Sequence, residues 1–230
     1  MITTESLAGM LQLSSATLPI GAFSHSLGLE AAAEAGLVRD VLSVERWIGD
    51  QLECQWARAE GPLWLSLYAA WSEPDEPALQ RGNDRLLAMR ESQELLLECT
   101  QTGHSLRQWL LTLPAIPQLQ PEQRAVLGRI HPVSYGCVHA LAARALGLSA
   151  SSGLYACAWS LLENLCSAAV KLVPLGQTQG QALLRRLALR LPQVLTRAHA
   201  TSSEQISNFA PMLAILSAQH ESQYSRLFRS

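Results

Sequence analysis

The sequence predicts an all-α fold, a single-domain helical bundle of roughly eight to ten helices. Apolar residues recur every three or four positions along most of the chain, as one face of a helix requires. No segment shows the alternation or the β-branched clusters that are typical of strands. A length of 230 residues accommodates one large domain, and no internal repeat divides the chain.

Helix signals near the N-terminus predict two short helices joined by a turn. The first is expected to end before Pro19, and the second to run over residues 27–35. Ser24 or Ser26 is expected to cap the second helix, because a serine side chain accepts hydrogen bonds from free backbone N–H groups. Gly36 then ends that helix.

A longer helix is predicted to begin near Asp40 or Ser43. Its apolar face has spacings of three and four residues and comprises Val44, Trp47, Ile48, Leu52 and Trp56. Gly61-Pro62 is expected to break this helix, because proline lacks the backbone N–H that a helix interior uses. A shorter helix should then continue to Trp71, and Asp75 is a candidate cap for the next one.

The middle of the chain, from Ala78 to Leu113, is expected to form two helices. Gly82 and Gly103 are the weak points at which the helical pattern could be interrupted. The three prolines of the following segment, 113–121, predict a loop. A short helix over residues 122–129 and a break at His131-Pro132 should follow.

Four helices are expected in the last hundred residues. The first covers residues 133–146, and the second is capped by a serine of the segment 149–152 and reaches Val173. This second helix is apolar around more than half of its circumference, which is typical of the centre of a bundle. A third covers 177–198, where a kink is expected at Pro192, and the last runs from about Asn208 to Gln219.

Composition and charge exclude several classes of protein. The net charge is -2 and there is no basic stripe, so we expect no binding to nucleic acid. The apolar runs are shorter than the roughly 18 residues that span a bilayer, and the N-terminus lacks a basic signal region. The five widely spaced cysteines form no disulfide pattern. We therefore expect a cytoplasmic protein that does not enter membranes.

Charged residues make up only 16% of the chain, against roughly 25% in an average soluble domain. Two interpretations are open. The chain is an Ala- and Leu-rich helical protein, or part of its surface is covered by a partner, because the centres of interfaces are depleted in charge.

The segment LPIGAFSHSLGLE, at 18–30, raises the question of catalysis. His25 and Ser26 could suggest a hydrolase, but the chain has no GxSxG elbow, and adjacent residues rarely point at each other. Pro19 and Gly21 instead predict a rigid turn that presents Phe23 and His25 for recognition. We expect no catalytic residue.

Metal and nucleotide sites are not expected either. His131, Cys137 and His139 are close in sequence, but helical positions 137 and 139 point in nearly opposite directions. The chain contains neither GxxxxGK[ST] nor GxGxxG. We expect no cofactor.

The C-terminal segment, 220–230, has a composition that is unusual for a terminus, because most chain ends are polar. It carries Tyr224, Arg226, Leu227 and Phe228 within a few residues, and these types are common at binding hot spots. A mobile tail would expose this apolar area to water without compensation. The tail is therefore expected to dock, either on the chain's own helices or on another protein.

Three segments carry a distinctive set of residues: LPIGAFSHSLGLEAAAEAG at 18–36, AVKLVPLGQTQGQ at 169–181 and SAQHESQYSRLFRS at 217–230. In order and spacing they resemble the UreF family of urease accessory proteins, over essentially the whole chain. The resemblance implies an all-helical, non-catalytic chaperone of nickel insertion into apo-urease. It also implies a homodimer that binds the accessory protein UreD (UreH in some organisms) and recruits or regulates the GTPase UreG.

The resemblance further implies a division into a helical domain, 1–219, and a partner-binding tail, 220–230. Many relatives have tyrosine where this chain has Phe23, so a phenolic hydrogen bond is lost here. An alternative role is that of a nickel-binding metallochaperone in its own right, using His25, His131, Cys137 or His139. The partner-binding residues that the resemblance implies are Phe23, His25, Ser26, Gly28, Glu30, Lys171, Tyr224, Arg226, Leu227 and Phe228.

Overall fold

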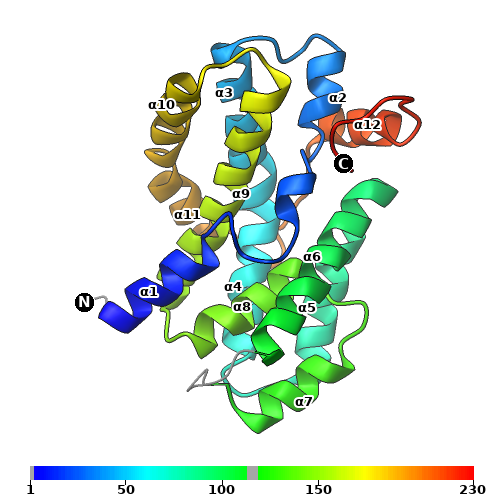
Figure 1. Cartoon of the computed structure of the whole chain (residues 1–230). Helices are drawn as coiled ribbons and strands as arrows, with labels where there is room; N and C mark the ends of the chain where they lie inside the picture. Colours follow the sequence, from blue (N-terminus) through cyan, green and yellow to red (C-terminus); the bar gives the residue numbers. More distant parts are fainter. Residues whose placement is uncertain (1–2, 113–118) are drawn as a thin grey trace.

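A long helix, α9 (Ala150–Leu172), runs through the middle of the molecule and has other helices around it (Figure 1). The structure is a computed structural model that describes residues 3–112 and 119–230. Within those ranges every regular element is a helix, so the predicted all-α class is confirmed. None of the described helices is both long enough and apolar enough to cross a membrane.

The other elements are α1 (Thr4–Leu13), the 3₁₀ helix η1 (Ala22–Ser24), α2 (Leu29–Glu34), α3 (Val41–Asp50), the π-helix η2 (Gln51–Glu60), α4 (Gly61–Ala70), α5 (Glu76–Ala88), α6 (Gln93–Thr112), α7 (Pro121–Arg129), α8 (Tyr135–Ala145), α10 (Gln177–Ala188), α11 (Leu191–Ala200) and α12 (Pro211–His220). The described ranges thus contain twelve α-helices, more than the eight to ten expected, and one predicted helix, at 177–198, is divided into α10 and α11.

The composition of α9 explains its central place. Alanine, cysteine and leucine side chains of this helix are buried on most of its circumference, including Leu154, Cys157 and Leu165. Helix α10 packs along one side of α9, and α8, α1, α11 and α2 pack on others. Such burial is the main source of stability in a helical bundle, at roughly 25 cal/mol for each Å² of apolar surface removed from water.

A second group of helices, α5 to α8, forms the lower part of the view in Figure 1. Helices α6 and α8 pack closely because Gly103 lies between them. A Cβ atom at Gly103 would collide with the backbone of residues 133–135, including the carbonyl oxygen of Val133. Gly103 therefore permits a close helix contact in the middle of α6 and does not interrupt it, contrary to the expectation of a weak point.

The second predicted helix begins later than expected. Helix α2 starts at Leu29, after Gly28, which has a left-handed backbone with φ of 80°. No side chain caps α2 in the usual N-cap position, but the Ser26 hydroxyl accepts a hydrogen bond from the Glu30 N–H at 3.1 Å. Ser26 therefore satisfies a free N–H group of this helix from outside it, as a capping serine would.

The predicted break at Gly61-Pro62 is wrong. Helices α3, η2 and α4 follow one another without interruption from Val41 to Ala70. Pro62 is the second residue of α4 and is preceded by ten residues of π-helix, whose turns are wider than those of an α-helix. The aromatic side chains of Trp56 and Trp64, before and after the proline, are both buried, so packing favours continuation.

Other boundaries differ by smaller amounts. The break between α5 and α6 lies at residues 89–92, and neither Gly82 nor Gly103 interrupts a helix. The predicted helix at 177–198 is divided into α10 and α11, with Pro192 in the first turn of α11, where its missing N–H costs nothing. Most of the predicted loop at 113–121 lies outside the described residues.

Candidate partner-docking surface

The N-terminal loop before α2 is fixed by its backbone and by two neighbouring helices. Gly21 has φ of 75°, and the Ser24 hydroxyl donates a hydrogen bond to the Gly21 carbonyl oxygen at 2.8 Å. The Asn164 side chain of α9 donates to the His25 carbonyl oxygen at 2.9 Å, and Gln51 donates to the Leu27 carbonyl oxygen at 3.1 Å. The loop is therefore a rigid part of the molecule, as the turn signals predict.

The C-terminal tail docks on this loop. The Ser230 carbonyl oxygen accepts hydrogen bonds from the backbone N–H of Ser26 at 2.6 Å and of Leu27 at 3.1 Å, and from the Ser26 hydroxyl at 2.6 Å. The Arg229 N–H donates to the Ser24 carbonyl oxygen at 2.9 Å. Backbone hydrogen bonds thus join the C-terminal tail to the loop before α2, and the tail docks on the chain's own body.

The carboxylate of Glu30, on α2, holds the middle of the tail. One oxygen accepts from the Leu227 N–H at 2.7 Å, and the other accepts from the Phe228 N–H at 2.8 Å. The second oxygen also lies 3.2 Å from Nε2 of His220. Glu30 is only 7% exposed, so these hydrogen bonds replace the water that the buried carboxylate has lost.

His220 connects Glu30 to α6. Its Nδ1 lies 2.7 Å from the Glu94 carboxylate, whose other oxygen is paired with Arg226 of the tail. Each ring nitrogen of His220 therefore faces a carboxylate oxygen. Next to this group, the Glu221 carboxylate accepts from the Gln93 N–H at 2.6 Å and occupies the N-terminus of α6.

Phe228 is the apolar anchor of the tail, because its side chain is only 5% exposed. The Nζ atom of Lys171, at the end of α9, lies 5.3 Å from the centre of the Phe228 ring, which is within the range of a cation–π contact. Three separated segments of the sequence therefore meet at one place in the fold: the N-terminal loop, the end of α9 and the tail.

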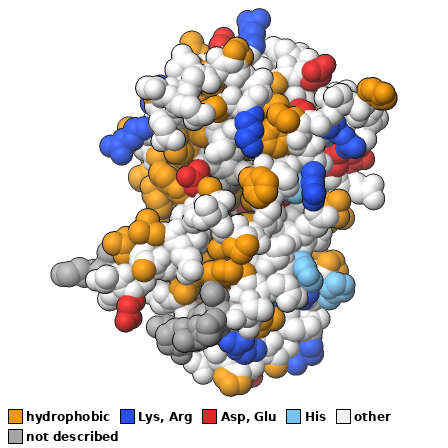
Figure 2. Space-filling view, viewed as in Figure 1, with side chains coloured by type: hydrophobic (Ala, Val, Ile, Leu, Met, Phe, Trp, Pro, Cys, Tyr) orange, Lys and Arg blue, Asp and Glu red, His pale blue; other side chains and the backbone are white. Residues whose placement is uncertain are grey.

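Apolar side chains on α12 and the tail remain at the surface. We call this set the α12–tail surface: Phe209, Met212, Ile215, Tyr224 and Leu227, with exposed fractions between 49% and 104%. In Figure 1 these elements lie beside α2, at the edge of the molecule nearest the C-terminus. Figure 2 shows other hydrophobic side chains at the surface of this face with charged ones between them.

The structure brings most of the predicted partner-binding residues together, but it buries several of them. Glu30, Ser26, Gly28 and Phe228 lie beneath or beside the tail, whereas Phe23 is 66% exposed. The expectation that the turn presents His25 is wrong, because His25 is only 3% exposed and its Nδ1 lies 2.9 Å from the Ser230 hydroxyl. Whether these residues contact a partner stays a prediction.

Burial also governs the ionisation of His25. Loss of water, followed by the positive charge of Arg229, lowers the pKa of His25 from 6.5 to about 4. Its ring is therefore neutral at physiological pH. Ser26, its neighbour, uses its hydroxyl as donor to Ser230 and as acceptor from Glu30. Both side chains thus have structural partners, and no hydrogen bond joins them as in a nucleophile–base pair.

The residues considered for a metal site are dispersed. His131 is exposed, whereas Cys137 and His139 are buried in α8. The His139 Nδ1 accepts a hydrogen bond from the Trp64 indole at 3.2 Å, and burial lowers the pKa of His139 to about 3. Over residues 3–112 and 119–230, no three His, Cys, Asp or Glu side chains are grouped so that they could hold a metal ion.

Sequence reasoning missed Glu94, Glu221 and the role of His220. Glu94 and Glu221 lie 127 positions apart, so their proximity has no local signal. His220 lies in the third motif, but a histidine at the end of a helix gives no sign in the sequence of its contacts with Glu30 and Glu94. The missing information is the packing of α12 across the N-terminus of α6, which only the tertiary fold supplies.

Comparisons with known proteins show the family of the chain. The sequence model of the UreF family matches residues 38–188. A urease accessory protein UreF from Polynucleobacter asymbioticus is 41% identical over 232 residues, covering 100% of this chain and 99% of its own. One from Azoarcus sp. is 44% identical and covers 96% of this chain and 94% of its own.

A longer relative is also similar. A protein from Bordetella bronchiseptica named bifunctional urease accessory protein UreEF is 44% identical over 97% of this chain. The match occupies 52% of that relative's length. The matches to full-length relatives extend over the N-terminal loop and the tail, which lie outside the region that the family model matches.

Proposed function

Because the chain belongs to the UreF family of urease accessory proteins, we propose that it is a non-catalytic scaffold for the assembly of the nickel centre of urease. In this proposal it acts in the cytoplasm as a homodimer. It binds UreD (UreH) through the α12–tail surface, and the complex recruits or regulates the GTPase UreG on apo-urease.

The observation that carries the proposal is the combination of a fixed tail with exposed apolar side chains. Tyr224 and Leu227 project outward while Phe228 and Ser230, on the same tail, are buried. A preorganised apolar surface loses little conformational entropy when it binds, which favours association. Aromatic residues, methionine and arginine are also the residue types that are enriched at the centres of interfaces.

A scaffold fits the chemistry better than an enzyme does. The histidine and serine of the N-terminal loop are engaged in structural hydrogen bonds, as described above. The fusion named UreEF in Bordetella bronchiseptica supports a role beside other accessory proteins, because one polypeptide there carries two accessory names.

The first test is capture of UreD by the tagged chain. A chain ending at Gln219 should lose UreD while keeping its helical circular dichroism. Because this truncation also exposes the Glu30 carboxylate, the point variant Ile215→Asp, which changes only an exposed side chain, should give the same loss. Leu189→Asp, at an exposed leucine after α10, is the matched control and should bind normally.

Undiminished capture of UreD by both the truncated chain and Ile215→Asp would contradict the assigned surface.

The homodimer rests on the family resemblance and has its own test. Light scattering of the purified chain should give a mass twice the 25.1 kDa of one copy.

The nickel-binding alternative is tested by calorimetry of the isolated chain with Ni²⁺. The scaffold proposal predicts no stoichiometric binding in the micromolar range. Tight binding that is abolished by His25→Ala would instead favour a metallochaperone, and it would leave the capture experiment unchanged.

A further inference from the structure

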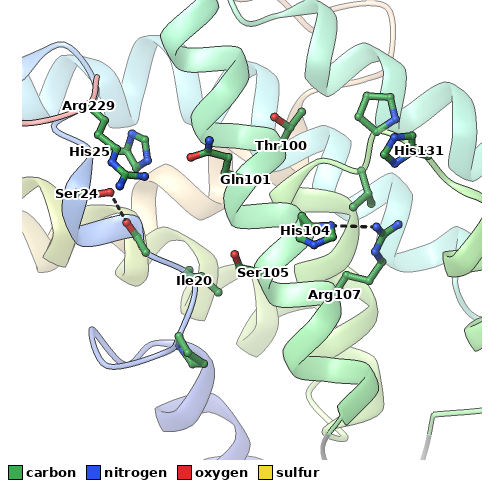
Figure 3. A pocket seen from close by; sticks show the side chains of 14 residues that line it. Ile20, Ser24, His25, Thr100, Gln101, His104, Ser105, Arg107, His131 and Arg229 are labelled. Carbon is green, nitrogen blue, oxygen red and sulfur yellow. Dashed lines mark hydrogen bonds between the residues drawn. The ribbon is translucent and has the colours of Figure 1, made fainter.

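A groove of about 550 Å³ lies between the N-terminal loop, α6 and the loop that contains His131 and Pro132 (Figure 3). It opens on the side of the tail where Arg229 lies. None of its lining residues belongs to the α12–tail surface, so the groove is a separate feature of the molecule.

The charges that line the groove are all of one sign. Arg107 and Arg229 line it together with three histidines, and no aspartate or glutamate does. In the part of the chain that the structure describes, neither arginine has a carboxylate within 4.0 Å, whereas Arg90 is paired with Glu60 and Arg190 with Glu53. A chain with a net charge of -2 thus concentrates unpaired positive charge in one groove.

Arg107 is held in place to face a ligand. Its guanidinium donates to the Ile130 carbonyl oxygen at 3.2 Å and lies 3.1 Å from Nδ1 of His104. Neither contact is with a carboxylate, so they orient the guanidinium without pairing its charge. The backbone of Arg229 is held by its N–H, which donates to the Ser24 carbonyl oxygen.

The two arginines lie at opposite ends of the groove. Figure 3 shows Arg229 beside His25 at one end and Arg107 beside His104 at the other, with Thr100, Gln101 and Ser105 between them. This floor belongs to α6, and the helical rise from Thr100 to Arg107 gives a length of about 10 Å. The two guanidinium groups therefore offer separate positions for two anionic groups.

We propose that the groove binds an extended acidic segment of a partner protein, with two carboxylates about three residues apart. Three residues of an extended segment in the polyproline II conformation span about 9 Å and bring the fourth side chain back to the same side, which is close to the length of the floor of the groove. Each carboxylate then meets one arginine, and the hydroxyl and amide groups of the floor bind the backbone between them. The proposal goes beyond the docking of UreD, because it names a second surface and the chemistry of its occupant.

The position of Arg229 couples this groove to the tail. Because Arg229 belongs to the docked tail, one end of the groove exists only while the tail is seated on the N-terminal loop. Binding of the acidic segment therefore stabilises the seated tail, and release of the tail weakens the binding of the segment by the same factor.

The test uses a rhodamine-labelled peptide with the core Glu-Gly-Gly-Glu and fluorescence anisotropy at low ionic strength. The peptide should bind the full chain, and the matched Gln-Gly-Gly-Gln peptide should not. Arg107→Gln and Arg229→Gln should each raise the dissociation constant about fivefold, the upper range for one exposed ion pair. Arg185→Gln removes an exposed arginine on α10, outside the groove, and should have no effect.

Equal binding of the two peptides, or an equal loss in Arg185→Gln, would overturn the proposal, because either result would indicate non-specific attraction. Sodium phosphate at matched ionic strength provides a further arm. If phosphate displaces the peptide far more effectively than chloride does, the groove is a site for small anions and the assignment of a protein segment is wrong.

Discussion

At the scale of single residues, the seating of the tail depends most on Glu30. Its two oxygens bind consecutive backbone N–H groups of Leu227 and Phe228, and one also faces His220. Hydrogen bonds to a charged group contribute about 1.5–3 kcal/mol each, and the burial of the carboxylate makes their loss costly. Glu30 on α2 thus holds both the end of α12 and the tail, which follow it by 190 positions or more.

Glu30→Gln should therefore release the tail while leaving the helices folded. A neutral amide keeps the size of the side chain, but it cannot accept two N–H groups as strongly and has no charge for His220. The amides of Leu227 and Phe228 should exchange hydrogen about tenfold faster or more, since 1.4 kcal/mol corresponds to a factor of ten. Exchange measured by mass spectrometry on tail peptides provides the test.

Glu34→Gln is the matched control for that experiment, because Glu34 is an exposed glutamate on the same helix. It should leave exchange of the tail unchanged. If the tail amides are equally protected in Glu30→Gln and in the unmodified chain, the carboxylate does not hold the tail.

His25 predicts a pH dependence of stability. Its pKa is lowered from 6.5 to about 4 in the folded chain, so the unfolded chain binds more protons between these values. The contribution of neutral His25 to the free energy of unfolding is complete above about pH 6.5 and is lost progressively as the pH falls towards 4. Urea unfolding between about pH 7 and pH 5 should show this decline.

His25→Asn isolates that contribution from other titrating groups. Asparagine can still bond the Ser230 hydroxyl but does not titrate, so the decline in stability towards pH 5 should be shallower than in the unmodified chain. Parallel declines in the two proteins would mean that His25 does not carry the pH dependence.

At the scale of elements, Gly28 determines how α2 and α12 meet. Its φ of 80° is unfavourable for residues with a Cβ atom, and a Cβ there would collide with the Leu213 side chain of α12. Gly28→Ala combines backbone strain of about 1–2 kcal/mol with an overpacking cost of about 1–3 kcal/mol. It should therefore lower the free energy of unfolding by at least about 2 kcal/mol.

Gly36→Ala separates these two effects. Gly36 has a similar φ of 72°, but nothing lies within 4 Å of the position of its Cβ atom. It should show the strain alone, about 1–2 kcal/mol, in the same denaturant experiment. Equal losses in the two variants would mean that the contact between Gly28 and α12 adds nothing to the cost.

The elements that the sequence predicts well are those with local signals. The caps at Asp40, Asp75 and Ser149 each accept a hydrogen bond from the backbone N–H three residues later, as the residue types indicate. The break expected at Gly61-Pro62 fails, because the burial of Trp56 and Trp64 outweighs a local propensity. Local preferences thus fix helix starts more reliably than helix ends.

At the scale of the whole molecule, the motif residues were predictable but their arrangement was not. The motifs at 18–36, 169–181 and 217–230 identify the family, and the fold brings them together. Which residues hold the tail and which remain exposed depends on long-range packing. Phe228 and Tyr224 are both aromatic residues of one tail, yet the first is 5% and the second 104% exposed.

The surface of the whole molecule explains part of the low charge content. Exposed apolar side chains on α12 and the tail account for part of the surface that charged residues do not occupy. Exposed apolar side chains gathered on one part of a surface mark interaction sites in many proteins. The proposal that the α12–tail surface binds UreD rests on this feature.

Hydrogen exchange of the chain with and without UreD tests this central claim most directly. We predict that UreD slows exchange in peptides covering residues 209–230 and the first turns of α6, while peptides of α10 are unaffected. Slower exchange confined to other helices, with residues 209–230 unchanged in a complex shown to be intact, would contradict the account.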